Sequence, residues 1–181
     1  MKTFNIKKFE ENKGKQGYTN EYHYKLNDNS NIREFSFDDT SSKNYQREVS
    51  KEFSPFKFTY TYYENGSIYT YAGFFNKSHI GIYKIFDQNG QVIKEIDDDK
   101  NFKHSFEQIH DFVLKEKNID IYDTRQAVAL RHDTPFAPIK KYYQIHVLKS
   151  NFVDGQWYSQ PNYSFLIDDE TGQIVKSSKK K

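Results

Sequence analysis

Two Asn-Gly pairs restrict the fold of this chain more than any other feature of its sequence. Asn65-Gly66 and Asn89-Gly90 each separate two runs of aromatic and β-branched residues, and an Asn-Gly pair in that setting is a strong signal for a β-hairpin. Both residue types tolerate a positive φ, so we expect a type I′ turn at each pair. Because the pairs lie 24 positions apart, at 65 and 89, residues 56–99 are predicted to form a two-copy hairpin repeat.

Aromatic residues alternate with other residues in the first run of this repeat. Phe56, Phe58, Tyr60 and Tyr62 occupy every second position, which places them on one face of a strand. Hairpins that follow one another in sequence usually pair with their neighbours. We therefore expect a four-stranded antiparallel meander with strands at 56–62, 68–72, 80–86 and 91–96.

The composition agrees with a β-rich protein and excludes several kinds of chemistry. Fifteen Tyr and 16 Phe are present, and these residues favour pleated, half-buried surfaces. The mean hydropathy is -0.97, and no apolar run approaches the roughly 20 residues of a membrane helix, so we expect no membrane partner. The absence of cysteine excludes disulfides and thiolate sites. A net charge of +2 gives no reason to expect a nucleic-acid partner.

Weaker patterns precede the repeat. Residues 1–17 fit either a short strand or a helical turn. The other expected elements are a hairpin formed by 18–26 and 32–37, an exposed loop at 38–43 and a weakly patterned stretch at 44–53.

One convincing helix follows the repeat. Ser105 and Gln108 have the spacing of a capping box, and the helix is expected to end near Asn118. Its apolar positions at helical spacing are Phe106, Ile109, His110, Val113 and Leu114. Further strands are expected at 126–131, 141–148, 163–167 and 173–176.

These elements predict an α+β fold. An antiparallel β-meander of hairpin repeats is followed by one amphipathic helix, which packs on a C-terminal antiparallel sheet. We expect a β-rich region over residues 1–100 and a helix-plus-sheet region over 101–181, with a single continuous domain as the alternative.

The repeat resembles a known family. Its sequence contains Tyr62-Tyr63-Glu64-Asn65-Gly66, Gly73, Gly81-Ile82-Tyr83-Lys84, Phe86-Asp87 and Asn89-Gly90. This pattern over residues 56–99 is similar to the MORN-type hairpin repeats of a bacterial antitoxin-like family. The chain departs from that pattern in having two copies only, and in having Gln88 and Gln91 where a regular repeat carries charged residues. The resemblance implies an immunity protein that binds a toxin.

The C-terminal region has a second resemblance. The order of a helix and then strands, ending in the hairpin Tyr163–Lys176 around Asp168-Asp169-Glu170-Thr171-Gly172, is similar to PepSY-like modules over residues 102–177. Those modules are small α+β units associated with inhibition or with cell-envelope proteins. Turn geometry alone is a sufficient reason for the Asp and Gly residues of this hairpin.

The sequence contains no motif for catalysis or metal binding. His104 and His110 are six positions apart on the expected helix, so they lie on different faces. The run Asp97-Asp98-Asp99 lacks the glycine and glutamate of a calcium loop, and it is expected to precede the helix as acidic charge. Without a nucleophile elbow, phosphate loop or dinucleotide motif, we expect no enzyme, no cofactor and no metal.

The aromatic residues exceed what one small core readily buries, so some of them are expected on a surface for a protein partner. The candidate partner-binding residues are Tyr60, Tyr62, Tyr69, Tyr71, Phe74, Asp97, Asp98, Asp99 and Trp157. We predict a non-catalytic immunity protein that occludes the active site of a cognate toxin, with the acidic run steering a basic partner.

Two other functions stay open on the sequence alone, a cell-envelope or glycan-binding module and an enzyme of unrecognised class. We expect a monomer or a small homo-oligomer. The N-terminal residues MKTFNIKKFEENKGKQ contain no secretory signal, so a cytoplasmic location is expected, with a trimmed exported protein as the alternative.

Overall fold

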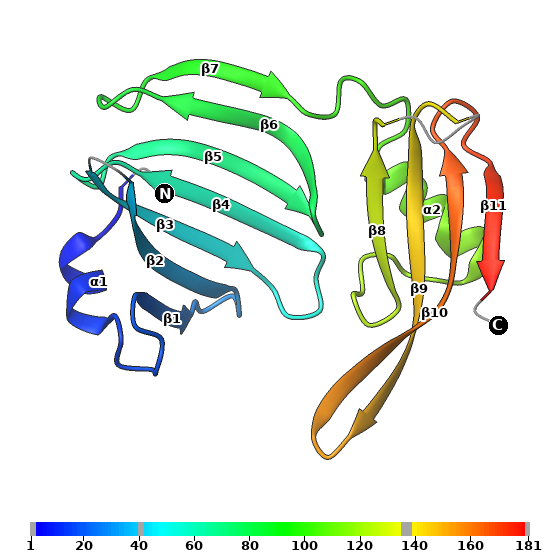
Figure 1. Cartoon of the computed structure of the whole chain (residues 1–181), viewed down its shortest axis with the longest axis horizontal. Helices are drawn as coiled ribbons and strands as arrows, with labels where there is room; N and C mark the ends of the chain where they lie inside the picture. Colours follow the sequence, from blue (N-terminus) through cyan, green and yellow to red (C-terminus); the bar gives the residue numbers. More distant parts are fainter. Residues whose placement is uncertain (1–2, 40–41, 135–138, 180–181) are drawn as a thin grey trace. The chain divides into compact units, whose positions relative to one another are not determined.

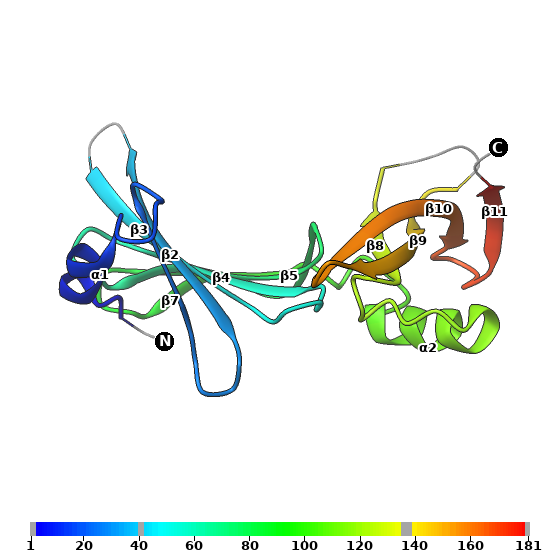
Figure 2. The same cartoon turned by 90° about the horizontal axis from the view of Figure 1, so that it is seen from below.

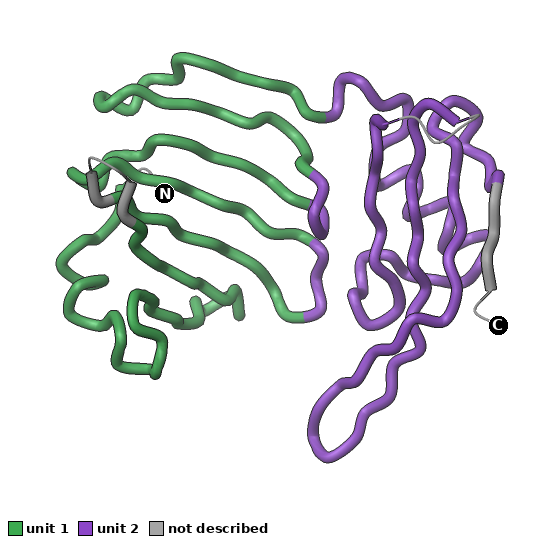
Figure 3. The backbone as a smooth tube through the Cα atoms, viewed as in Figure 1, with its two compact units in different colours: residues 1–52, 56–74, 79–98 green, residues 53–55, 75–78, 99–181 purple. Residues whose placement is uncertain are grey.

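A computed structural model describes residues 3–39, 42–134 and 139–179 (Figure 1). Contacts divide the chain into two compact units (Figure 3). Unit 1 contains Met1–Glu52, Phe56–Phe74 and His79–Asp98, and unit 2 contains Phe53–Pro55, Phe75–Ser78 and Asp99–Lys181. Antiparallel strands dominate the described residues and two helices accompany them, which confirms the α+β class. No helix in these ranges is long and apolar enough to cross a membrane.

Unit 1 is a seven-stranded antiparallel meander in which the strands follow sequence order across the described residues. The strands are β1 (Glu21–Lys25), β2 (Asn31–Asp39), β3 (Ser42–Ser50), β4 (Phe56–Tyr62), β5 (Ile68–Phe75), β6 (Ser78–Phe86) and β7 (Val92–Asp97). The predicted four-stranded meander is therefore part of a larger sheet. The prediction of an exposed loop at 38–43 is wrong, because the backbone of residues 38–39 belongs to β2 and that of residues 42–43 belongs to β3. Residues 40 and 41 lie outside the described ranges.

A short N-terminal helix closes the core of unit 1. The helix α1 (Ile6–Asn12) starts at Asn5, whose side chain accepts the Lys8 N–H at 3.0 Å, so the helical alternative for residues 1–17 is the one observed. The Phe4 ring stacks on Tyr45 at 4.8 Å and lies 5.1 Å from the Tyr62 ring. The buried cluster consists of Phe4, Phe9, Tyr45, Tyr62 and Ile68.

A buried ion pair lies beside this cluster. Arg47 Nε donates to Glu34 Oε1 at 2.7 Å, and the two side chains are 11% and 3% exposed. The Tyr24 hydroxyl donates to the same carboxylate at 3.1 Å, and Arg47 donates to the Tyr62 hydroxyl at 3.3 Å. Burial and the Glu34 charge raise the pKa of Tyr24 to about 12. Four polar side chains from four strands thus satisfy one another inside the sheet's covered face.

The two Asn-Gly turns differ from the predicted type I′ geometry. Gly66 and Gly90 have φ values of 80° and 77°, but Asn65 and Asn89 are not among the residues with positive φ. Gly66 N–H donates to the Tyr63 carbonyl at 2.8 Å, and Gly90 N–H bonds Asp87 in the same way at 3.0 Å. Each connection is a three-residue loop that ends in a left-handed glycine.

Side-chain acceptors explain the difference. Asn65 Oδ1 accepts the Ser67 N–H at 2.9 Å, and Asp87 Oδ1 accepts the N–H groups of Asn89 and Gln91, both at 2.9 Å. These local bonds stabilise the loop without a positive φ at asparagine.

Unit 2 is a four-stranded antiparallel sheet with one helix. The order of its described strands is β11 (Ile174–Lys179), β10 (Gln156–Asp168), β9 (Tyr142–Val153) and β8 (Ala127–His132). The helix α2 (Phe106–Lys117) covers one face (Figures 1 and 2). Phe106, Ile109 and Val113 of α2 are buried together with Tyr143 and Ile145 of β9.

The ends of α2 confirm the prediction. Ser105 and Gln108 form both bonds of a capping box, and Asn118 ends the helix in a left-handed conformation. Leu114 departs from the expected apolar stripe because its side chain is 41% exposed.

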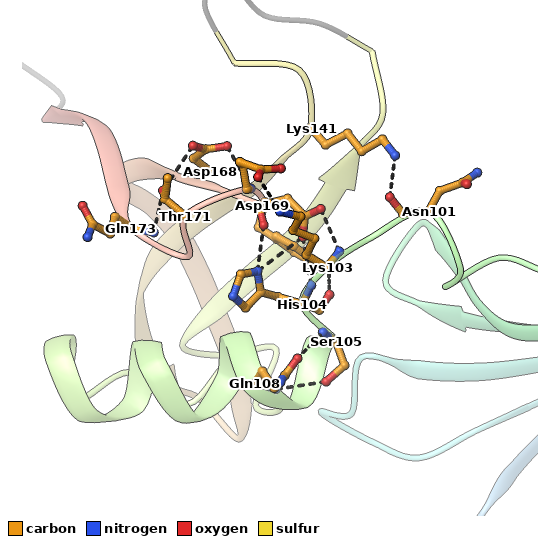
Figure 4. Close-up of polar contacts among 12 residues, drawn as sticks. Asn101, Lys103, His104, Ser105, Gln108, Lys141, Asp168, Asp169, Thr171 and Gln173 are labelled. Atoms are coloured by element: carbon orange, nitrogen blue, oxygen red, sulfur yellow. Dashed lines mark hydrogen bonds and ion pairs between the residues drawn. The ribbon is translucent and has the colours of Figure 1, made fainter.

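The turn between β10 and β11 holds the start of α2 in place. The buried Asp169 carboxylate accepts the N–H groups of Lys103 and His104 at 2.9 and 3.0 Å (Figure 4). The Asp169 carbonyl lies 2.8 Å from His104 Nδ1, and the Tyr143 hydroxyl donates to the His104 carbonyl. The carboxylate thus satisfies N–H groups that precede the helix.

Removal of the cation from the buried pair is expected to destabilise unit 1 strongly. Arg47→Met leaves the Glu34 carboxylate buried without its partner, and such a loss costs about 3–5 kcal/mol. The control Lys84→Met removes an exposed pair with Glu95, which is worth at most about 1 kcal/mol. Urea unfolding followed by circular dichroism measures both changes. Equal losses of unfolding free energy would contradict the role assigned to the buried pair.

The two repeated turns offer a matched pair of substitutions. Gly66→Ala and Gly90→Ala both force alanine into a left-handed conformation, at a cost of about 1–2 kcal/mol. A Cβ at position 66 also meets the Phe4 carbonyl oxygen at 3.0 Å, whereas a Cβ at position 90 meets nothing within 4 Å. We expect Gly66→Ala to lower the melting temperature more than Gly90→Ala does, as measured by calorimetry. The reverse order would show that the Phe4 contact imposes no constraint.

Candidate functional site

A β-ribbon of unit 2 extends beyond its four-stranded sheet (Figure 1). We call residues 149–160 the aromatic arm; it contains the last residues of β9, the first residues of β10 and the turn between them. The arm's strands pair with each other, with Trp157 opposite Phe152 and Tyr158 opposite Asn151. Phe152 is 60% exposed and Tyr158 is 53% exposed. The arm therefore presents large apolar side chains that the sheet does not bury.

The two faces of the arm differ. Phe152 and Trp157 share one face, and their rings lie 5.3 Å apart. We call this the Trp157 face. Val153, Tyr158 and Asn151 point to the opposite face, because successive side chains alternate along a strand.

A guanidinium group supports the Trp157 face. The Arg125 guanidinium carbon lies 4.8 Å from the centre of the Trp157 ring and 4.4 Å from that of Phe53. Asp123 accepts bonds from Arg125 Nε at 2.9 Å and from Nη2 at 2.7 Å. These bonds from Arg125 hold the pKa of Asp123 below its ordinary value of 3.8. A fixed cation that contacts both rings gives the arm a rigid base.

Phe53 reaches this site in an uncommon backbone conformation. Its φ is 58°, which is unfavourable for a bulky residue. The Phe53 carbonyl accepts the Thr124 N–H at 2.8 Å, and this bond holds the conformation. Strained residues of this kind often occur at functional sites.

A shallow cleft lies beside Trp157. Its volume is about 350 Å³, and its lining includes Ile119, Arg125, Leu148, Ser150 and Trp157. Small apolar groups fit the side formed by Ile119 and Leu148, and Arg125 and Ser150 add polar contacts at the rim.

The expected surface residues of unit 1 have different environments. Tyr62 is fully buried under α1 and is removed from the expected surface, because its ring fills the core. Tyr60 and Tyr71 are half-buried with their rings 5.2 Å apart. Tyr69 is exposed. Phe74 is half-buried, and its ring lies 4.4 Å from that of His79.

The acidic run is divided between ion pairs. Asp99 bonds Arg131 at 2.6 Å, and Asp98 lies 3.7 Å from His79 Nδ1. Asp97 is the last residue of β7. The carboxylates of Asp98 and Asp99 thus already face ionisable or positive partners, which weakens any field that steers a distant molecule.

Charges also pair with one another on the face of the unit 1 sheet that α1 does not cover. Arg33 bonds Glu21 at 2.5 Å and Glu48 at 3.3 Å, and Lys57 bonds Glu48 at 3.2 Å. Bonding to Arg33 is the main cause that lowers the pKa of Glu21 to about 2. This ladder joins strands β1 to β4 and leaves no strong excess of one sign.

Sequence reasoning placed Trp157 among the candidates but missed its neighbours. Phe152, Val153 and Tyr158 lie on the arm, and Phe53 and Arg125 come from two other segments. A signal for the arm was present, because Asp154-Gly155 separates two runs with aromatic residues. Asp154 and Gly155 have φ values of 50° and 80°, so the type I′ turn occurs here.

The described residues contain no group of three or more His, Asp or Glu side chains that could hold a metal ion. Comparison of the chain with protein-family models, with curated proteins and with solved structures gave no match. The MORN-type and PepSY-like resemblances therefore stay predictions.

Trp157 is the chain's single tryptophan, so its fluorescence reports on the arm. Asp123→Asn removes the charge that holds Arg125, and we expect a red-shifted emission at neutral pH. Because the folded-state pKa of Asp123 is lowered, this carboxylate's stabilisation is complete above its unfolded pKa of about 4 and is lost as the pH falls through the folded value. The native emission should thus hold constant from about pH 7 to about pH 5.

The control for this substitution is Asp111→Asn, which neutralises an exposed carboxylate of α2. Its emission should match that of the native chain. An unchanged spectrum for Asp123→Asn would show that the ion pair does not position the tryptophan.

Proposed function

We propose that this chain is a non-catalytic protein-binding module, an immunity protein that neutralises a bacterial toxin by stoichiometric binding, and that the aromatic arm is its main contact with the toxin. The observation that carries the proposal is the concentration of exposed aromatic side chains on a projecting ribbon with a rigid base. The resemblance of residues 56–99 to antitoxin-type repeats supports the choice of partner.

The chemistry of the arm suits a protein partner. Trp, Tyr and Arg are the residues that contribute most often to binding energy at protein interfaces. Phe152, Val153, Trp157 and Tyr158 are all more than 40% exposed, so a partner removes much apolar surface from water when it covers them. Arg125 already holds the Trp157 ring, and a side chain that is fixed before binding loses less entropy.

The shape of the arm suits occlusion of a cleft. A two-stranded ribbon is narrow, because its strands lie about 4.8 Å apart. The Asp154-Gly155 turn at its tip is tight. In the proposed mechanism the ribbon enters the toxin's active-site cleft, and the Trp157 face contacts the wall. The proposal assigns no steering role to Asp97, Asp98 and Asp99.

The experiment uses the full chain and the toxin encoded beside its gene. We expect one-to-one binding and loss of toxin activity in calorimetry and in an activity assay. Phe152→Ser should weaken binding at least about tenfold, because a buried Phe is worth about 1.5–3 kcal/mol and 1.4 kcal/mol is a factor of ten. The control Leu114→Ser removes an equally apolar, 41% exposed side chain from α2 of the same unit and should leave binding unchanged.

Equal affinities for the native chain and Phe152→Ser would remove the arm from the interface. If the neighbouring toxin does not bind at all, the immunity assignment fails. Retardation of the chain in polysaccharide gels would then favour the glycan-binding alternative.

A further inference from the structure

The sheet edges of this protein are protected to different degrees. An open edge presents unpaired backbone groups to any other strand. On the outer edge of β8, the Asn76 side chain donates to the Ala129 carbonyl and Ser78 Oγ accepts the Arg131 N–H, each at 3.0 Å. On β7, Lys94 and Glu95 place charges along the exposed strand. Both devices oppose pairing with a further strand.

The β10 edge of the aromatic arm has neither protection. Strand β11 pairs with β10 only from Tyr163 to Ile167. The part of the edge from Gln156 to Gln160 is exposed, and none of its residues is charged. Among the described residues, no backbone bond reaches this side of the arm.

The turn fixes which backbone groups point outward. A two-residue turn at Asp154-Gly155 makes Val153 and Gln156 a hydrogen-bonded pair, and the pairs alternate from there. Trp157 and Ser159 therefore direct their N–H and C=O groups away from β9. The same alternation directs Leu148 outward, and its N–H does bond the Gln126 carbonyl at 2.8 Å. The alternation also directs the backbone nitrogen of Pro161 outward. Proline has no N–H to donate, so it is tolerated on this outer side.

We propose that a second copy of this chain pairs with the β10 edge of the arm in an antiparallel dimer centred on Tyr158. In this register Trp157 of each copy lies opposite Ser159 of the other and exchanges two backbone hydrogen bonds with it. Tyr158 lies opposite Tyr158, and Gln156 lies opposite Gln160.

The sequence of the edge favours a second copy over an unrelated strand. Residues 156–160 read Gln-Trp-Tyr-Ser-Gln, so the side chains on the Tyr158 face are the same in both directions. A two-fold axis through Tyr158 opposes glutamine to glutamine and tyrosine to tyrosine, with no like charges in contact. On the β7 edge, an axis through Lys94 or Glu95 would instead oppose like charges.

The dimer also changes the surface available to a partner. A two-fold axis perpendicular to the ribbon keeps the same face upward in both copies, so the two Trp157 faces adjoin in one four-stranded ribbon. The paired segments are short, and the contact is smaller than the roughly 1,200 Å² of a stable complex. The dimer is therefore expected to dissociate on dilution.

Disulfide trapping tests the register, since the native chain contains no cysteine. Residues in a non-hydrogen-bonded antiparallel pair have Cα atoms about 4.5 Å apart, within the range of about 4.4–6.8 Å that a disulfide spans. Tyr158→Cys should give a covalent dimer under mild oxidation with oxidised glutathione. In the control Asn151→Cys, on the same face one strand away, the cysteines are separated by about 14 Å, and the chain should stay uncrosslinked.

Charge placement provides a second test without crosslinking. Tyr158→Lys opposes two cations across the axis and should abolish dimers in sedimentation equilibrium at high protein concentration. Asn151→Lys adds the same charge farther than a Debye length from its copy and should leave the dimer intact. The Trp157 emission shows whether each variant keeps its arm folded.

Two results would overturn the dimer: a native chain that sediments as a monomer at the highest concentration, or equal crosslinking of Tyr158→Cys and Asn151→Cys. Neither measurement uses a toxin, so the dimer stands or falls independently of the immunity proposal.

Discussion

Backbone hydrogen bonding between adjacent strands is the constraint on which both units depend. Each strand of unit 1 pairs with its sequence neighbours, so the chain closes its ladders through local hairpins at a low cost in loop entropy. The strands at the sheet edges still have backbone N–H and C=O groups that no neighbouring strand pairs, and these groups face solvent. Side chains cover the β8 edge, charges mark β7, and the arm keeps an open edge without charge. The open edge and the exposed rings thus occur on the same element of unit 2.

Aromatic packing supplies the second organising interaction. The centre of the Phe4 ring lies within 5.5 Å of the ring centres of Tyr45, Tyr62 and Phe9. A single side chain that precedes α1 thus joins the helix to the sheet. Each tyrosine ring in this core also carries a hydroxyl group. The Tyr24 and Tyr62 hydroxyls bond the Glu34–Arg47 pair. The tyrosine-rich composition and the buried charges therefore depend on each other.

Local signals predicted the hairpins of residues 56–99 and the capping box of α2, because each depends on residues a few positions apart. Strand β3 had no clear pattern, since its Arg47 points into the covered face and finds its counterion, Glu34, on another strand. The type I′ turns predicted at the two Asn-Gly pairs were wrong, because side-chain acceptors at Asn65 and Asp87 determine the conformation of these loops. Tyr62 was placed on a surface because no pattern shows which face α1 covers.

Only Trp157 of the arm's aromatic residues was anticipated. The Arg125 contact joins segments that lie far apart in sequence, and spacing alone carries no information about such a contact.

Unit 2 draws on three separate stretches of the chain (Figure 3). Phe53 closes the Arg125 stack, and Asn76 and Ser78 occupy the β8 edge. These three residues precede Asp99, where the continuous part of the unit begins. The unit is thus discontinuous in the gene, and a fragment cut at this boundary would have an open β8 edge and an incomplete base for its tryptophan. Evolution by exchange of contiguous gene segments could not transfer this module intact unless Phe53–Pro55 and Phe75–Ser78 moved with it.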